Sequence, residues 1–181
     1  MSPGLHLRAL RVALLAVGLG YCSVAQAAGP APLSLTQLTK KAGFIFAGRV
    51  LRVERPAAQA DRVPVVQVTL QVEHALLGTQ RGQIFTLTQW AGAWESGPHL
   101  RPGQRLLLVL YPCSPTGLTS VVGGRLGQFD LDAGGNIVLR GEQQRVLLSQ
   151  PDQPAGWRST RPPAKFRYRD FAGRIRRAAG Q

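Results

Sequence analysis

The chain has 181 residues, with 22 Lys or Arg against nine Asp or Glu, and therefore a formal net charge of +13 at pH 7. A basic chain of this kind favours polyanions or acidic proteins as partners. Its length supports one domain with a real hydrophobic core, and two cysteines in the whole chain exclude a small scaffold held together by disulfides.

Residues 1–27 have the pattern of a cleaved secretory signal peptide. Arg8 and Arg11 provide the positive charge, and an apolar run of about ten residues follows over 12–21. This run is shorter than the ~20 residues that a membrane-spanning helix needs. An Ala-x-Ala triplet at 25–27 is the pattern that signal peptidase recognises. We therefore expect export to the periplasm or the extracellular space, with no transmembrane segment after cleavage; an uncleaved anchor or a buried helix is the alternative.

No set of residues predicts a catalytic or metal site. His74 and His99 are the histidines beyond the signal segment, and a zinc site needs three or four ligands at short spacings. Asp130 and Asp132 flank a predicted turn, which accounts for them without catalysis. Cys113, alone after cleavage, is expected to be a buried small hydrophobic residue, with an intermolecular link or a reactive thiol as alternatives. The sequence predicts a non-enzymatic protein without a cofactor.

The first predicted elements are a helix and a strand. Ser34 is a suitable N-cap for a helix over 35–42, and Gly43 follows in the position of a C-cap. The run 44–54 predicts a strand, in which Gly48 indicates a bulge or a sharp bend.

Three further strands are expected in the middle of the chain. Over 66–73 apolar residues alternate with polar ones, which is the clearest strand pattern in the sequence. The segments 84–90 and 105–111 predict two more strands, separated by a loop over 91–104. The run 105–111 is apolar throughout, which is typical of a strand buried on both faces.

The rest of the chain predicts a hairpin, a linker and a terminal helix. Residues 129–131 and 137–139 form the hairpin, and the four prolines of 149–163 indicate a linker or surface arm. Helical spacing of Tyr168, Phe171, Ile175 and Ala178 predicts an apolar stripe on a basic helix. The expected organisation is a signal peptide (1–27), a β domain (28–148), a linker (149–163) and a basic amphipathic helix (164–181).

Five or six short strands with helices only at the ends predict a mainly β fold. A small closed or nearly closed barrel with a short N-terminal helix and a short basic C-terminal helix satisfies this pattern, and a sandwich is the alternative.

This order of elements, together with the sequence SPTGLTSVVGGRLGQFDLD at 114–132, resembles a group of exported bacterial proteins of undefined role. More distantly, 35–139 resembles the netrin-like OB barrel of the tissue inhibitors of metalloproteinases. The resemblance implies a five- to six-stranded OB-like barrel and a secreted habit. In those inhibitors a cysteine at the mature N-terminus chelates the zinc of the protease, whereas this chain has Ala28 near that position, so the inhibitory residue is not carried over.

The glycine-rich stretch 114–128 is the most unusual local feature. Its glycines permit close approach of the backbone and its polar side chains supply hydrogen bonds, so it is a candidate for holding an anion or the backbone of a partner. The alternative is that the glycines let strands cross a tight corner of the barrel. The candidate binding residues here are Thr116, Gly117, Thr119, Ser120, Gly123, Gly124 and Arg125. Trp90 and Trp94, which flank Gly92, are candidates for an aromatic contact surface; packing in the core is an equal alternative for Trp90 and a weaker one for Trp94.

Positive charge is concentrated beyond residue 154, where eight basic residues accompany one acidic residue, Asp170. Exported proteins seldom meet nucleic acid, so anionic lipid, glycan or an acidic protein is the expected partner. The apolar stripe of the terminal helix either packs on the domain or dips into a lipid interface. The candidate polyanion-binding residues are Arg167, Arg169, Arg174, Arg176 and Arg177.

The sequence as a whole predicts an exported, non-enzymatic binding or inhibitor-like module that contacts a protein partner in the cell envelope, with a protease as partner by analogy alone. The second hypothesis is a cationic protein that binds anionic lipid or glycan through its C-terminal arginines. A hydrolase is the third.

Overall fold

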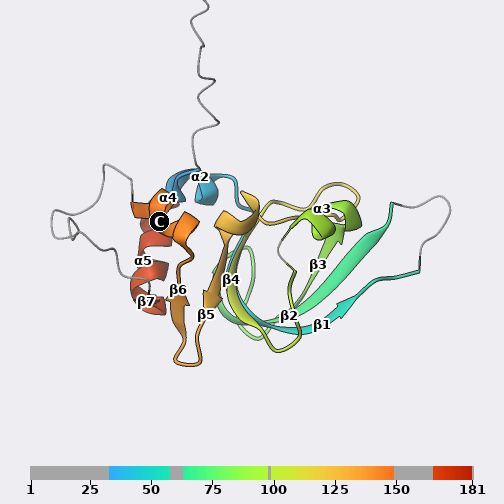
Figure 1. The fold of residues 1–181 in the computed structure, drawn as a ribbon, viewed down its shortest axis with the longest axis horizontal. Coiled ribbons are helices and arrows are strands. Elements are labelled where there is room, and N and C mark those ends of the chain that lie inside the picture. Colours follow the sequence, from blue (N-terminus) through green and yellow to red (C-terminus); the bar gives the residue numbers. More distant parts are fainter. Residues whose placement is uncertain (1–32, 58–62, 98, 149–164, 181) are drawn as a thin grey trace, which may run out of the picture. The chain divides into compact units, whose positions relative to one another are not determined.

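The computed structural model describes residues 33–57, 63–97, 99–148 and 165–180 (Figure 1). The predicted signal peptide and the proline-rich linker lie outside the described residues. Seven strands form one antiparallel sheet in the order β3-β2-β1-β4-β5-β6-β7, so the prediction of a mainly β fold is confirmed. The elements are α2 (Leu35–Lys40), β1 (Phe44–Glu54), β2 (Val65–Leu77), β3 (Ile84–Trp90), α3 (Ala91–Ser96), β4 (Arg105–Leu110), η1 (Gly124–Gly127), β5 (Gln128–Leu131), β6 (Asn136–Val138), α4 (Gly141–Leu148), β7 (Lys165–Arg167) and α5 (Tyr168–Ala178).

Local sequence determines how the described chain begins. The Ser34 side chain accepts a hydrogen bond from the Gln37 backbone N–H (3.1 Å), and the Gln37 side chain accepts one from the Ser34 N–H (2.8 Å). This reciprocal pair is a capping box, and it confirms Ser34 as the N-cap of α2. In β1 the register against β2 shifts between Ala47 and Gly48, where a side chain would overlap the Gln71 carbonyl oxygen. The predicted irregularity at Gly48 is confirmed.

The sheet separates two hydrophobic cores, and β4 contributes to both. Leu106, Leu108 and Leu110 point into the first core, while Leu107 and Val109 point into the second. Burial of β4 on both faces is therefore confirmed. The first core also contains Phe46, Val50, Val66, Val68, Leu70, Val72, Phe85, Leu87, Trp94 and Leu100. The second also contains Leu38, Ile45, Phe129, Ile137, Leu139, Phe166, Phe171 and Ile175.

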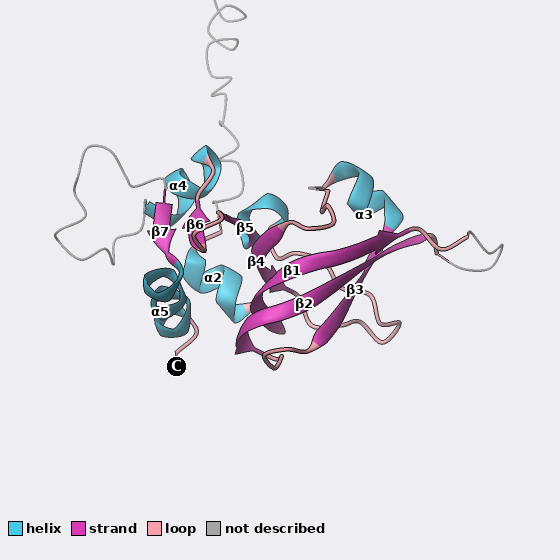
Figure 2. Cartoon of the chain, turned by 90° about the horizontal axis from the view of Figure 1, so that it is seen from below, coloured by secondary structure: helices cyan, strands magenta, loops and turns pink. Residues whose placement is uncertain are grey.

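The second core is covered by helices from the two ends of the described chain. Leu38 of α2 and both Phe171 and Ile175 of α5 are almost fully buried in it, and α2 contacts α5. Figure 2 shows these two helices at the β5–β7 end of the sheet, with α3 at the other end. Segments from opposite ends of the chain therefore complete one core.

The described strands do not close into a barrel. After β4 the chain returns beside it, with hydrogen bonds from Tyr111 N–H to Ser120 O (3.0 Å) and from Val122 N–H to Val109 O (2.8 Å). On its other side this returning segment reaches β3 through one hydrogen bond, from Thr119 N–H to Thr88 O (2.9 Å). One hydrogen bond is not a ladder, so β3 and β7 remain the edges of an open sheet.

Three expectations from the sequence differ from the structure. The sheet has seven strands within the described residues, rather than five or six. The expected loop over 91–104 begins with the helix α3, and α4 was not predicted at all. The expected helix over 164–181 begins with a strand, β7, which pairs with β6 because Phe166 lies opposite Ile137 and fills the second core.

A charged cluster crosses three adjacent strands. Arg105 of β4 donates to both oxygens of the Glu73 carboxylate on β2, with Arg105 Nη2 2.6 Å from Glu73 Oε2. Arg49 of β1 lies between them, 3.7 Å from Glu73. The hydrogen bond from Arg105 is the main reason that the pKa of Glu73 lies below its ordinary value of 4.5.

We expect Glu73→Gln to lower the free energy of unfolding by about 1 kcal/mol at neutral pH, because the ion pair is only partly buried. Since folding lowers the pKa of Glu73, this contribution is complete above pH 4.5 and is lost as the pH falls below it. Urea unfolding of both proteins between pH 3 and pH 7 measures the difference. The control is Glu54→Gln, which removes an exposed pair with Arg52 and should cost under ~0.5 kcal/mol. A difference that stays constant across this range would contradict the assignment.

Candidate functional site

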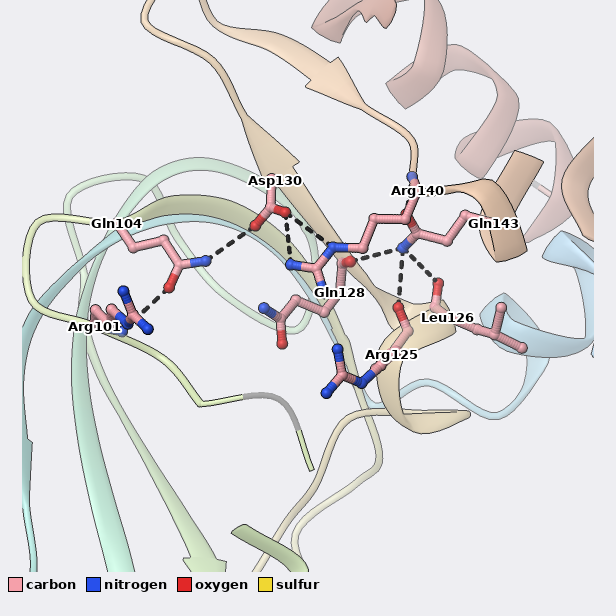
Figure 3. Close-up of polar contacts among 8 residues, drawn as sticks. All are labelled: Arg101, Gln104, Arg125, Leu126, Gln128, Asp130, Arg140 and Gln143. Carbon is pink, nitrogen blue, oxygen red and sulfur yellow. Dashed lines mark hydrogen bonds and ion pairs between the residues drawn. The ribbon is translucent and has the colours of Figure 1, made fainter. Parts of the chain in front are cut away.

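A polar hollow of about 610 Å³ lies between the end of α3, the turn before β4, and β5. Figure 3 shows the side chains that converge there. We call it the arginine hollow and define it by Arg101, Gln104, Arg125, Gln128, Asp130 and Arg140. These residues come from the turn before β4, from η1, from β5 and from the residue before α4, so only the folded chain brings them together.

Two carboxylates line the arginine hollow: Glu95, which lies 3.8 Å from Arg55, and Asp130, which is held by hydrogen bonds. The Asp130 carboxylate accepts hydrogen bonds from Arg140 Nη2 (2.7 Å), from Arg140 Nε (3.2 Å) and from Gln104 Nε2 (3.0 Å). Gln104 in turn accepts a hydrogen bond from the Arg101 backbone N–H (3.1 Å). The Asp130 charge is therefore neutralised by Arg140, and Gln104 connects this pair to the turn that carries Arg101.

Gln143 of α4 holds the other wall of the arginine hollow. Its side-chain N–H groups donate to the backbone carbonyls of Gln128 (2.7 Å) and Arg125 (2.9 Å), while its oxygen accepts from the Arg140 N–H (2.9 Å). Gln143 is 2% exposed. One buried amide therefore fixes the backbone of three residues that line the hollow.

Two guanidinium groups in the arginine hollow have no partner among the described residues. Among the residues that the structure describes, no hydrogen bond or ion pair engages the guanidinium groups of Arg101 and Arg125, and both residues are exposed. Figure 3 shows the Arg125 guanidinium directed away from its backbone carbonyl. Unpaired guanidinium groups on a fixed frame favour a carboxylate or phosphate ligand.

Gln128 presents an unused acceptor in the same place. The residue is 1% exposed, and its side-chain oxygen Oε1 has no hydrogen-bond partner in the described part of the chain. Leaving a buried acceptor unpaired costs about 1–3 kcal/mol. The side chain lines the arginine hollow, so a ligand that carries an N–H or O–H group there would satisfy it.

A second, smaller hollow of about 260 Å³ adjoins the first. Its walls are mainly apolar, from Ala93, Leu100 and Val121, and we call it the apolar hollow. It shares Ser96, Gly97 and Gln128 with the arginine hollow. The unpaired Gln128 amide therefore stands on the wall between a basic compartment and an apolar one.

The structure separates the candidate residues of the glycine-rich stretch. Arg125 lines the arginine hollow, and Ser120 and Gly124 line the apolar hollow. Thr119 is buried, and its hydroxyl donates to the Tyr111 carbonyl (2.7 Å).

The remaining candidates of the stretch lie in turns. Thr116 and Gly117 belong to an exposed turn in which the Gly117 N–H donates to the Ser114 carbonyl (2.8 Å). Gly123 and Gly124 have positive φ angles of 65° and 58°, which only glycine adopts readily. The alternative that these glycines serve chain geometry therefore accounts for Gly117 and Gly123, whereas Gly124 also borders the apolar hollow.

The structure buries Trp94, which was the candidate for a surface contact, and exposes Trp90. Trp94 is 5% exposed in the first core, where its ring stacks on His99 with centroids 5.3 Å apart. Trp90 is 52% exposed at the end of β3. The cause is α3, which turns the chain at Ala91 and directs Trp94 inward. Trp94 is therefore a core residue and not a surface contact.

The C-terminal arginines surround a helix whose apolar face is buried. Phe171, Ala172 and Ile175 are at most 2% exposed, so the stripe packs on the sheet and is not available to a lipid interface. Arg174 lies 5.7 Å from the centre of the Phe166 ring, and partial burial lowers its pKa. The arginines Arg167, Arg169 and Arg176 line a hollow of about 650 Å³ with His74 and Tyr168, while Arg177 is exposed.

The potentially reactive groups are dispersed. Cys113 is exposed, so the expectation that it is buried is wrong; Pro112 and the turn after it keep this part of the chain at the surface. His74 stacks on Tyr168, and His99 stacks on Trp94. Within the described residues no three His, Cys, Asp or Glu side chains are placed to hold a metal ion. In the same residues, no helix is both long and apolar enough to span a membrane.

Comparison of the chain with protein-family models, with curated proteins and with solved structures finds no match.

Proposed function

We propose that the protein is an exported, non-enzymatic binding module that captures an anionic group of a protein partner in the arginine hollow. The observation that carries this proposal is the pair of unpaired guanidinium groups, Arg101 and Arg125, beside the unpaired buried oxygen of Gln128. A protein that keeps such groups without internal partners gains from a ligand that supplies the missing contacts.

The support around Arg101 and Arg125 favours binding rather than catalysis. Asp130 is held in an ion pair with Arg140, and Gln143 fixes the backbone of Arg125. These contacts position the arginines of the hollow, and they leave the Asp130 carboxylate engaged by Arg140 rather than available as a general base. Preorganisation of this kind lowers the entropy that a partner loses on binding.

We also propose that β1–β4 and the segment after them have an OB-like arrangement. Strands β1, β2 and β3 form a meander, β4 returns beside β1, and the segment after β4 contacts both β4 and β3. The helix α3 connects β3 to the turn before β4. The netrin-like resemblance adds an inhibitor-like role, with a protease as partner by analogy, and the pattern of residues 1–27 supports export to the periplasm or the extracellular space.

The test is a comparison of envelope proteins captured by residues 28–181 and by the double variant Arg101→Ala, Arg125→Ala. We expect a protein that the unaltered chain retains and the double variant recovers about tenfold less, because two charge-assisted contacts are lost. Arg81→Ala, in the exposed turn before β3, is the matched control and should behave as the unaltered chain. Equal recovery by all three proteins would overturn the proposal.

A second candidate function rests on the C-terminal arginines. Arg167, Arg169 and Arg176 line one hollow, and a basic surface of this kind binds anionic lipid headgroups or glycans through charge alone. Recovery of lipid or glycan that is lost at high salt, and that is unchanged in the double variant, would favour this function.

A further inference from the structure

We infer that the arginine hollow and the apolar hollow together bind the free C-terminal end of a polypeptide whose last residue is apolar. This inference rests on the proposed function and names the part of the partner that the site recognises. It follows from the position of Gln128, which lines both hollows and whose buried side-chain oxygen has no partner in the described part of the chain.

The end of a polypeptide carries three groups at fixed positions around one α-carbon: a carboxylate, a backbone N–H and a side chain. The site offers one complement to each. Arg101 and Arg125 complement the carboxylate, Gln128 Oε1 accepts from the N–H, and the walls at Leu100 and Val121 receive the side chain. The three complements adjoin one another because the hollows share Ser96, Gly97 and Gln128.

Other anionic ligands leave part of this arrangement unused. An ionised Asp or Glu side chain only accepts hydrogen bonds, so it cannot satisfy the Gln128 oxygen. An inorganic phosphate or an acidic sugar has no apolar group for the walls of the apolar hollow. An apolar hollow of about 260 Å³ has room for one side chain rather than for a lipid tail. The C-terminal residue of a polypeptide meets all three requirements.

The backbone of Gln128 is held by two neighbours. Gln128 begins β5, where Leu108 pairs with it, and its carbonyl accepts the hydrogen bond from buried Gln143. These contacts fix the backbone from which the Gln128 side chain extends between the two hollows. A ligand without the N–H should lose affinity even when its carboxylate and its side chain are unchanged.

The experiment uses fluorescent peptide pools in which four positions are randomised and the last residue is Leu. Fluorescence anisotropy with residues 28–181 compares the free carboxylate with three matched pools: a C-terminal amide, an N-methylated last residue, and Asp as the last residue. We expect the first pool to bind and each of the others to bind about tenfold more weakly, since each lacks one of the three contacts. The double variant Arg101→Ala, Arg125→Ala should abolish the advantage of the free carboxylate, and Arg81→Ala should leave it unchanged.

The outcomes separate the inference from the proposed function. Equal binding of the amide and carboxylate pools, or binding of neither, overturns the inference. If an envelope protein is then still captured in a way that depends on Arg101 and Arg125, the proposed function holds. The arginine hollow then binds an anionic group of the partner other than its C-terminal carboxylate. If neither the preference for a free carboxylate nor the capture that depends on Arg101 and Arg125 is observed, both the inference and the proposed function are wrong.

Discussion

Replacing Phe171 with Ala is expected to lower the free energy of unfolding by about 3–5 kcal/mol. Phe171 is 2% exposed in the second core, and its ring meets Phe129 edge to face with centroids 4.9 Å apart. It also lies 6.0 Å from the ring of Phe166 on β7. A cavity here would loosen both the terminal helix and the edge strand.

The matched control for Phe171→Ala is Arg169→Ala, an exposed position on the same helix. It should change the free energy of unfolding by less than ~0.5 kcal/mol in denaturant titrations. Equal stability of the two variants would mean that α5 does not belong to the core. The prediction also determines how the C-terminal arginines are studied: because α5 completes the second core, removing it would unfold the domain, and single arginine substitutions are the informative variants.

Gln143→Ala is expected to cost about 2–3 kcal/mol of stability and to weaken binding in the arginine hollow. The buried amide donates to the carbonyls of Gln128 and Arg125, and truncation leaves the buried Gln128 carbonyl without this donor. Arg140 loses the acceptor for its backbone N–H as well. The hollow should therefore lose the frame that places its arginines.

The neighbouring substitution Gln144→Ala provides the comparison on the same helix. Its side chain makes one hydrogen bond, to the Leu139 carbonyl (2.9 Å), so it should cost at most ~1 kcal/mol and leave binding unchanged. Unfolding curves and the capture assay measure both effects. A Gln143→Ala protein with unaltered stability and capture would contradict the positioning role of Gln143.

Local patterns were sufficient to predict much of the sheet. Alternation over 66–73 predicts β2, and the apolar run that becomes β4 predicts burial on both faces, because each pattern records which faces a strand buries. Ser34 and Gln37 likewise indicate where α2 begins, because their side chains form a local pair of hydrogen bonds. These features depend on neighbours in sequence, and the sequence is therefore informative about them.

The site depends on contacts between distant residues, and most of it could not be predicted. Of the residues that define the arginine hollow, the sequence indicated only Arg125. Arg101 reaches the same place because Gln104 bonds to Asp130 across the β4–β5 pair, 26 residues along the chain. The helix α4 begins at Gly141, and the Gln143 side chain accepts a hydrogen bond from the Arg140 N–H three residues earlier. This contact is half of a capping box, and it was the available signal for the helix.

Local sequence patterns also could not predict which strands form the edges of the sheet. Whether the segment after β4 closes the barrel depends on how many hydrogen bonds it makes with β3, and it makes one, at Thr119. The turn at Ala91 decides the burial of Trp94 in the same way, since α3 directs that ring into the first core. The alternation of residues in a strand predicts which of its faces is buried, but it does not predict whether the strand lies at an edge of the sheet.

The most direct measurement of anion capture is an isotope-edited NMR titration with the Leu-ending, free-carboxylate peptide pool. The signals to follow are the side-chain N–H signals of Arg101 and Arg125 and the side-chain amide signal of Gln128, each assigned with a variant that replaces that residue. Binding at the arginine hollow predicts that these three signals shift together and saturate at one peptide concentration. Shifts confined to Arg167, Arg169 and Arg176, with the hollow unchanged, would contradict it.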